Sequence, residues 1–131
     1  EEAGLLAVVH SGWRGVYAGA VATAARALEA RGAQPARLRA WIGPCIRQRH
    51  YEVSAELAAQ FAGRWGRPEE FLDGRLLDLP GLVARQLRDA GLPPAHITDC
   101  GVCTFGGSHW PAHRRQGAAR RQIFTAALLP P

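Results

Sequence analysis

A histidine at the end of an apolar run is the first residue of this sequence whose setting could serve chemistry. His10 closes the run LLAVVH and is followed by the turn Ser-Gly-Trp-Arg-Gly, which ends at Gly15. Glycines after a strand let a ligand or another backbone approach closely, so the imidazole of His10 could face a metal ion or a substrate. The alternative is a ring satisfied by a backbone carbonyl, and spacing alone favours that alternative.

Arg14 stands in the same turn, directly before a segment that we expect to be helical. Backbone N–H groups and the helix dipole favour an anion at the start of a helix, and a guanidinium binds phosphate through paired hydrogen bonds. The position of Arg14 therefore suggests a phosphate site. A solvated surface arginine is the other interpretation.

Cys45 is a candidate nucleophile or zinc ligand, because it follows the rigid Gly43-Pro44 break and precedes Arg47 by two residues. A guanidinium that points at a thiol lowers the pKa of the sulfur. A small buried thiol that fills space at a turn is the more common situation. No histidine stands at a fixed spacing to act as its partner, so the second interpretation is favoured.

Cys100 and Cys103 form a CxxC pair, which is weak evidence for a site. A zinc ribbon needs a second such pair, and a redox CxxC opens a helix, whereas this one lies in a strand-like segment. His109 and His113 are four residues apart, but Pro111 between them disfavours a regular helix. We expect both histidines in a loop.

A dense positive patch follows near the end of the chain, formed by Arg114, Arg115, Arg120 and Arg121. Guanidinium groups bind phosphate or carboxylate by paired hydrogen bonds, so an anionic substrate could dock there; a solvated basic turn is the alternative.

Glu52 could act in acid–base chemistry or cap neighbouring backbone, and the sequence does not distinguish between these two roles.

The composition favours a small soluble enzyme over a nucleic-acid or membrane protein. The net charge is +5, but the sixteen basic residues are all arginines and, apart from the patch near the end, they are scattered. No long apolar run or leader peptide is visible, and three cysteines are an odd number for a disulfide framework. We therefore expect reduced thiols, a cytoplasmic location, and neither nucleic acid nor membrane as a partner.

The elements that must position these residues alternate between strands and helices, which predicts an α/β or α+β class. No repeat or linker is evident, so residues 1–131 are expected to form one domain. The patterns predict strands at residues 5–10, 37–46, 96–104 and 122–129, a hairpin at Asp73-Gly74, and helices at residues 16–31, from Ser54 to about Trp65, and from Asp78 to Gly91.

Four motifs in order resemble the YfiH family, whose members have been labelled laccase-domain or polyphenol oxidoreductase proteins and purine nucleoside phosphorylases. HSGWRG resembles the family's HAGWRG signature, and IGPCIRQRHYEVSAEL is similar to its GPCI and YEV segment. LLDLPGLVARQL resembles its LDL and QL helix entry, and CTFGGSHWPAHRRQGAARRQ its C-terminal segment. Together they cover nearly the whole chain.

The resemblance implies a layered sandwich of mixed β-sheets flanked by helices, and one zinc ion held in part by His10. The family's other two ligands, a His and a Cys, precede the signature, and this sequence begins only nine residues before His10. The resemblance therefore implies the C-terminal part of a YfiH-like domain without its N-terminal region. Cys45 matches a family position that is not a metal ligand. Such a fragment alone could be inactive.

The resemblance further implies a zinc-dependent enzyme that cleaves adenosine and inosine with phosphate, with adenosine deaminase activity besides. The expected partners are a purine nucleoside and phosphate, and the expected oligomeric state is a monomer. The roles expected for this sequence are metal binding for His10, catalysis for His10, Arg14 and Cys45, and phosphate or substrate binding for Arg47, Arg114 and Arg115.

Three other functions stay open. The family's older label suggests copper-dependent phenol oxidation, but a multicopper centre needs clustered histidines, and the five histidines here are isolated. Hydrolytic editing of cell-wall precursors is a second possibility within the family. The third, from a different class, is a non-catalytic fragment or binding module.

Overall fold

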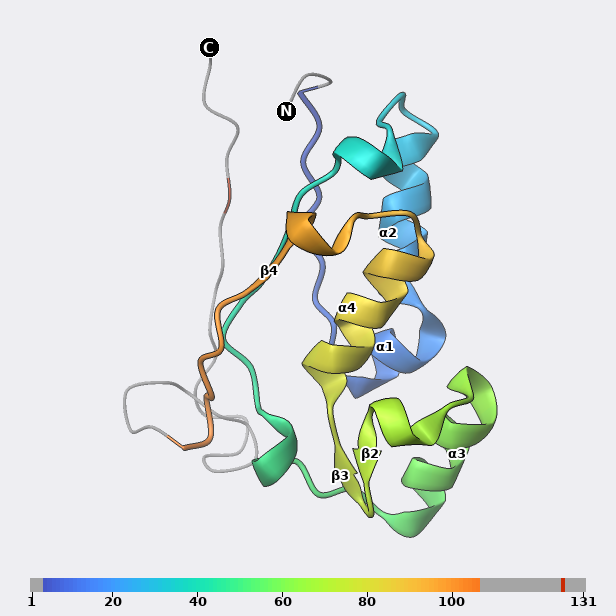
Figure 1. Ribbon diagram of the computed structural model, residues 1–131, viewed down its shortest axis with the longest axis vertical. Helices are drawn as coiled ribbons and strands as arrows, with labels where there is room; N and C mark the ends of the chain where they lie inside the picture. The colour runs from blue at the N-terminus through green and yellow to red at the C-terminus, as the bar shows by residue number, and fades with distance from the viewer. Residues whose placement is uncertain (1–3, 107–125, 127–131) are drawn as a thin grey trace. The chain divides into compact units, whose positions relative to one another are not determined.

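The structure is a computed structural model that describes residues 4–106 and Ala126, and the chain divides into two compact units. Unit 1 comprises Glu1–Trp41, Val83–Thr98 and Ile123–Pro131, and unit 2 comprises Ile42–Leu82 and Asp99–Gln122. Each unit is described by itself. Figure 1 shows the helices and strands of both. The one-domain organisation stays a prediction.

Two helices, α1 (Trp13–Ala18) and α2 (Ala20–Glu29), replace the single helix expected at residues 16–31. The break is at Gly19, which adopts a left-handed conformation with φ of 79°. Its N–H bonds back to carbonyls of α1, and its own carbonyl accepts the N–H of Thr23 at 3.0 Å, so one residue ends the first helix and begins the second. Glycine takes this conformation without the strain that a Cβ would bring.

The strand predicted at residues 5–10 is wrong. The structure assigns these residues no strand, and no backbone hydrogen bond joins them to another described residue. Three apolar side chains of the run are exposed, namely Leu6 (46%), Val8 (62%) and Val9 (40%). A strand requires a neighbour that pairs with its N–H and C=O groups, and an apolar run alone does not supply one.

The core of unit 1 forms where Val21 of α2 meets Leu87 and Leu92, with partly buried apolar side chains packed around them. Gln86 is also buried, and its amide Nε2 donates a 2.9 Å hydrogen bond to the carbonyl of Val16 in α1. The bond satisfies the amide nitrogen, which would cost about 1–3 kcal/mol if it were buried unpaired, whereas the amide oxygen has no hydrogen-bond partner among the described residues. This bond therefore ties the second half of α4 (Leu79–Asp89) to α1.

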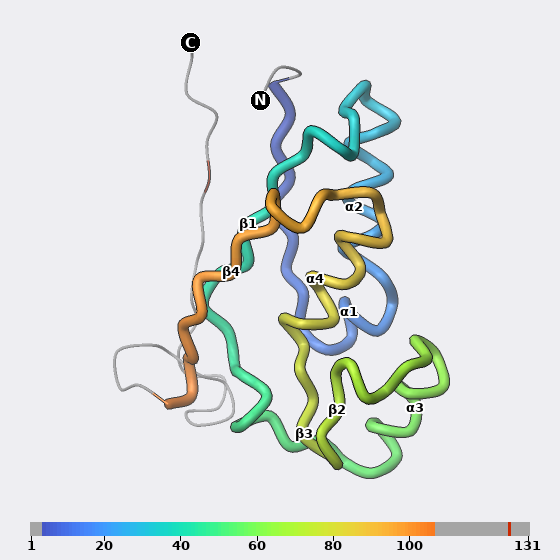
Figure 2. The backbone as a smooth tube through the Cα atoms, in the orientation of Figure 1, coloured from blue at the N-terminus to red at the C-terminus, as the bar shows by residue number. Residues whose placement is uncertain are grey.

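The strands β1 (Ala40–Ile42) and β4 (Ile97–Asp99) pair in a two-stranded sheet, and Figure 2 shows their traces running side by side. Both are shorter than the strands predicted at residues 37–46 and 96–104. The 3₁₀ turns η1 (Pro35–Arg37) and η4 (Pro94–His96) occupy the predicted strand starts. After the strands, the pairing resumes as one parallel bridge between Cys45 and Cys103.

Unit 2 contains η2 (Gln48–His50), α3 (Ala55–Trp65), η3 (Pro68–Glu70) and a hairpin of β2 (Leu72–Asp73) and β3 (Leu76–Leu77). The predicted α3 is confirmed, because the hydroxyl of Ser54 accepts the N–H of Leu57 at 3.2 Å and caps it. The hairpin predicted at Asp73-Gly74 is confirmed as well, and its turn places Gly74 at φ of 58°.

The helix predicted from Asp78 to Gly91 is confirmed as α4. The carboxylate of Asp78 accepts the N–H of Gly81 at 3.1 Å, and Gly91 ends the helix in a left-handed conformation with φ of 93°. The mixed α/β class is confirmed by helices that alternate with small parallel and antiparallel strand pairs. In the described part of the chain, no helix has the length and apolar character needed to cross a membrane. The strand predicted at residues 122–129 lies outside the described residues, apart from Ala126.

Two helical glycines, one beside the Asp78 cap and one in open space, provide a matched test of that cap. A Cβ on Gly81 would collide with the carboxylate of Asp78, whereas a Cβ on Gly63 in α3 would meet open space. Gly63→Ala should therefore raise the free energy of unfolding by about 0.5–1 kcal/mol through better helix propensity. Gly81→Ala should lower it by about 1 kcal/mol, because the clash with the Asp78 carboxylate and the loss of its cap outweigh the same gain in helix propensity. Urea unfolding of both variants measures the change, and stabilisation by Gly81→Ala would contradict the cap geometry.

Candidate functional site

The His10 turn in unit 1 holds its imidazole close to backbone. A Cβ placed on Gly12 would lie 3.2 Å from Nε2 of His10, and one placed on Gly15 would lie 3.3 Å from the carbonyl oxygen of His10. These are tighter than ordinary contacts, so the two glycines allow the chain to fold back over the histidine. His10 itself is exposed, which leaves its ring accessible to a ligand.

Arg14 is exposed in the first turn of α1, and its guanidinium carbon lies 4.4 Å from the centroid of the Trp13 ring. Stacking of this kind holds the charged group at the start of the helix. Since α1 has only six residues, its dipole is small, and an anion here would depend mainly on the guanidinium itself.

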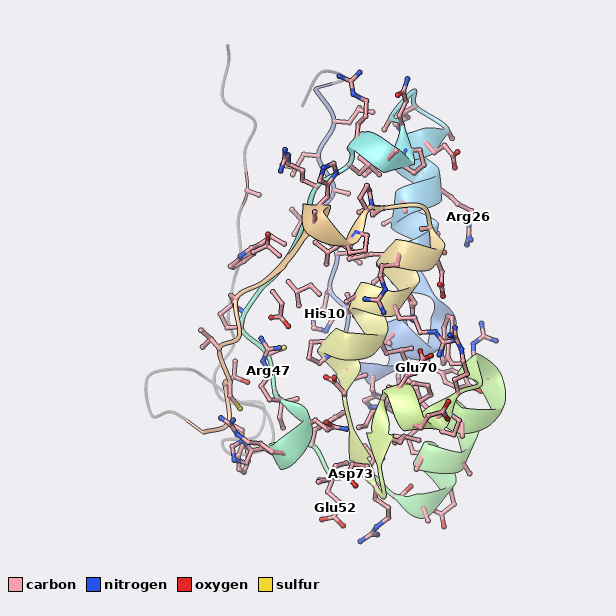
Figure 3. All side chains as sticks on the ribbon, viewed as in Figure 1. His10, Arg26, Arg47, Glu52, Glu70 and Asp73 are labelled. Atoms are coloured by element: carbon pink, nitrogen blue, oxygen red, sulfur yellow. The ribbon has the colours of Figure 1, made fainter. Side chains whose placement is uncertain are left out.

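Arg47 in unit 2, labelled in Figure 3, forms a two-pronged ion pair with Asp99. Its Nη1 and Nη2 donate to the two carboxylate oxygens at 2.6 Å and 2.5 Å, and its Nε donates to the carbonyl of Val102 at 3.4 Å. The hydrogen bonds from Arg47 lower the pKa of the Asp99 carboxyl. Three N–H groups of the guanidinium are therefore already hydrogen-bonded to residues 99 and 102.

Cys45 lies in one of the two segments that this ion pair joins. Its N–H donates to the carbonyl of Val102 at 3.2 Å, and its carbonyl accepts the N–H of Thr104 at 3.0 Å. Burial raises the pKa of the Cys45 thiol to about 11, and the charge of Arg47 only partly offsets this. At neutral pH the sulfur is a neutral thiol, which suits a wall of a site better than a nucleophile.

Sequence reasoning missed the pair formed by His50 and Cys103. Nδ1 of His50 lies 3.2 Å from Sγ of Cys103, although the residues are 53 positions apart. No spacing rule connects a histidine beside a Tyr-Glu-Val segment with the second cysteine of a CxxC. The signal exists only in the folded chain, where η2 and the Cys45–Cys103 bridge bring the two side chains together.

Glu52 takes a structural position at the hairpin. It forms an exposed ion pair with Arg75 and a bridge with Leu76, and Figure 3 shows it near Asp73 at the hairpin end. This favours a role at the hairpin over acid–base chemistry. The other predicted candidates lie outside the described residues, namely His109, His113, Arg114, Arg115, Arg120 and Arg121.

Residues 1–128 match the family described as multi-copper polyphenol oxidoreductase laccase. The chain belongs to this family. A solved structure, that of the Bacillus licheniformis hypothetical protein YfiH, superposes with a TM-score of 0.75 at 27% sequence identity. That superposition covers 83% of this chain and 44% of the other. The YfiH resemblance and the fold predicted from it are thereby confirmed.

Curated relatives of the chain carry a different name, purine nucleoside phosphorylase. The chain is 33% identical to "Purine nucleoside phosphorylase ORF3" of Streptomyces griseus, with 90% of this chain and 48% of the relative covered. It is 31% identical to a purine nucleoside phosphorylase of Deinococcus radiodurans, with 98% and 51% covered. The chain therefore spans about half the length of the curated relatives it matches.

The laccase family's description names copper, which suggests a metal. Within residues 4–106 and 126, however, no three His, Cys, Asp or Glu side chains gather so that they could hold an ion. His10 is the one predicted ligand in this part of the chain. A single imidazole does not make a catalytic metal site, which takes about three protein ligands.

The Arg47–Asp99 pair generates a pH-dependent stability. Because the pKa of Asp99 is lowered in the folded state, the pair stabilises the fold above the ordinary carboxyl pKa and is lost as the pH falls through the folded value. Asp99→Asn should lower the free energy of unfolding at pH 7 by about 1 kcal/mol, a value discounted because Asp99 is more than a third exposed. Unfolding by urea at pH 7 and pH 3 measures both effects.

The matched control is Asp89→Asn, because Asp89 is exposed and its contact with Arg85 is long at 3.7 Å. Its effect should stay within a few tenths of a kcal/mol. Equal losses in the two variants, or an Asp99→Asn variant as acid-sensitive as the parent, would show that the two-pronged pair does not stabilise unit 2.

Proposed function

We propose that this chain contributes to a purine nucleoside phosphorylase, in which phosphate cleaves the bond between base and ribose of adenosine or inosine. Adenosine deamination is proposed as a related activity of the same site. The observation that carries the proposal is the pair of relatives named purine nucleoside phosphorylase, which align with 90% and 98% of the chain. Since about half of each relative aligns, the activity is proposed for the whole protein.

His10 is proposed as one ligand of a single zinc ion. In support, the ring is exposed and the chain folds over it at Gly12 and Gly15, so that Nε2 stands beside backbone without a bulky neighbour. The described residues supply no group that completes the ligand set. The remaining ligands would have to come from residues outside the described ranges or from another chain.

Arg14 is proposed to bind the attacking phosphate. Its guanidinium is exposed and oriented by Trp13, so it can form a paired hydrogen bond with a phosphate group. Arg47 would first have to leave Asp99, so it is the weaker candidate. Cys45 is proposed as a neutral wall of the site, and Arg114 and Arg115 as further substrate contacts.

Phenol oxidation is the second candidate, because the laccase family's own description names it. A multicopper centre requires clustered histidines, and the described residues hold no such cluster. Copper-dependent oxygen uptake with a phenol as substrate separates the two activities. Uptake without base release from inosine would reverse the order of the candidates.

The first test of the proposal is His10→Ala in the protein expressed with its full coding sequence. If His10 holds the ion, the variant should lose stoichiometric zinc and at least a hundredfold of phosphate-dependent base release from inosine, which is the scale expected for a lost metal ligand. Zinc is measured by mass spectrometry and base release by chromatography. The control is His96→Ala, and unchanged zinc content in His10→Ala would remove His10 from the site.

The second test concerns phosphate. Arg14→Ala should raise the KM for phosphate about tenfold or more while the KM for inosine changes little, because a guanidinium lost from an anion site weakens that anion selectively. Arg26→Ala is the control, since Arg26 is an exposed arginine of α2 that donates to Thr23. If both variants raise the KM for phosphate equally, the net positive charge of the chain accounts for the effect and Arg14 does not bind phosphate directly.

A further inference from the structure

Cys103 lies in a small cluster of unit 2 that borders Cys45 and Arg47 but to which the proposed nucleoside chemistry gives no role. The turn η2 is closed by the hydrogen bond from the N–H of His50 to the carbonyl of Arg47 at 2.9 Å, which fixes the backbone of the histidine. The parallel bridge with Cys45 fixes the backbone of Cys103. Both members of the Cys103–His50 pair are therefore held by backbone pairing within unit 2.

Two further residues shape this cluster. The ring of Phe105 lies 5.2 Å from the ring of His50 at an interplanar angle of 39°, so it packs against the imidazole. A Cβ on Gly106 would lie 3.2 Å from Cε1 of His50 and 4.0 Å from Sγ of Cys103. A side chain at position 106 would press on the imidazole, so glycine suits the close passage of the backbone after Phe105.

Hydrogen bonds from one side chain and three backbone N–H groups reach the sulfur of Cys103. Burial raises the pKa of Cys103, but the hydrogen bond from His50 and those from the backbone N–H groups of Arg47, Gly106 and Phe105 outweigh it and lower the pKa to about 6. Cys103 is also partly exposed, so a small reagent can reach it. A thiolate held by an imidazole N–H and backbone amides is the environment of reactive cysteines.

Cys45 provides the contrast within the same strand pairing. It is bridged to Cys103, yet burial raises the pKa of Cys45 to about 11. Neither thiol is in a disulfide, so both are available for comparison in one molecule. Loss of water dominates at the Cys45 sulfur, whereas hydrogen-bond donors dominate at the less deeply buried Cys103 sulfur.

We propose that Cys103 is a modification site that exchanges with small disulfides, with His50 as the residue that positions and hydrogen-bonds its thiolate. The Cys103 sulfur attacks one sulfur of the disulfide, and a new S–S bond forms between protein and reagent. The old S–S bond breaks, and the other half leaves as a thiolate that takes a proton from water. The co-reactant is a low-molecular-weight disulfide such as oxidised glutathione; the Cys103 sulfur is oxidised to the mixed disulfide while the departing half of the reagent is reduced to a thiol.

The test is differential labelling of the unmodified chain. A brief pulse of iodoacetamide at pH values from 5 to 9 is followed by unfolding and a heavy-isotope label, and mass spectrometry of peptides gives the labelled fraction of each cysteine. Cys103 should be half-maximal near pH 6, whereas Cys45 should react slowly throughout. Oxidised glutathione should form a mixed disulfide at Cys103 before it does so at Cys45 or Cys100. A Cys103 profile centred at the ordinary thiol value, about 8.5, overturns the proposal.

His50→Asn separates the role of the histidine from that of the backbone. It should move the midpoint of the Cys103 profile up by about one unit or more, which lowers the thiolate population at pH 6 about fivefold and slows the reaction there about twofold or more. The rate falls less than the thiolate population, because a more basic thiolate is intrinsically more nucleophilic. His96→Asn, in unit 1, is the matched control and should leave the profile unchanged. An unshifted midpoint in a folded His50→Asn variant overturns the role of His50.

Discussion

The pairing of residues 42–45 with residues 100–104 is the constraint on which the geometry of unit 2 depends. It consists of three backbone hydrogen bonds of 3.0–3.2 Å, which join Cys100 to Ile42, Cys45 to Val102 and Thr104 to Cys45. A pairing between segments so far apart in sequence must offset the entropy of closing a long loop, which grows slowly with loop length. The Arg47–Asp99 ion pair adds a charge-assisted contact beside it.

This pairing accounts for the opposite behaviour of two neighbouring thiols. The segment that buries Cys45 also delivers Cys103 to the donors of His50 and the adjacent backbone. For Cys45, loss of water is the largest influence and the pKa rises; for Cys103, the donors outweigh that loss and the pKa falls. The nearest cation does not decide the outcome, because the guanidinium of Arg47 is already shared between Asp99 and Val102.

Features encoded within a few residues could be predicted from the sequence. The cap at Ser54, the cap at Asp78 and the turn at Asp73-Gly74 each follow from short-range hydrogen bonding and backbone preference, and all three are confirmed. The break at Gly19 was missed, because the surrounding alanines favour a continuous helix and one glycine is tolerated inside many helices. The strand predicted at residues 5–10 was wrong because of missing long-range information, since a strand is defined by a partner elsewhere in the chain.

The candidate sites show the same division between local and long-range information. The glycines around His10 were predicted to permit close approach, and the structure confirms this at Gly12 and Gly15. The Cys103–His50 pair could not be predicted, because it depends on a contact across 53 residues. The two sites also make different demands on the rest of the molecule. A metal at His10 needs ligands beyond the described residues. The donors to Cys103, namely His50 and the backbone of residues 47, 105 and 106, lie within unit 2, so thiol chemistry there does not depend on the completion of a metal centre.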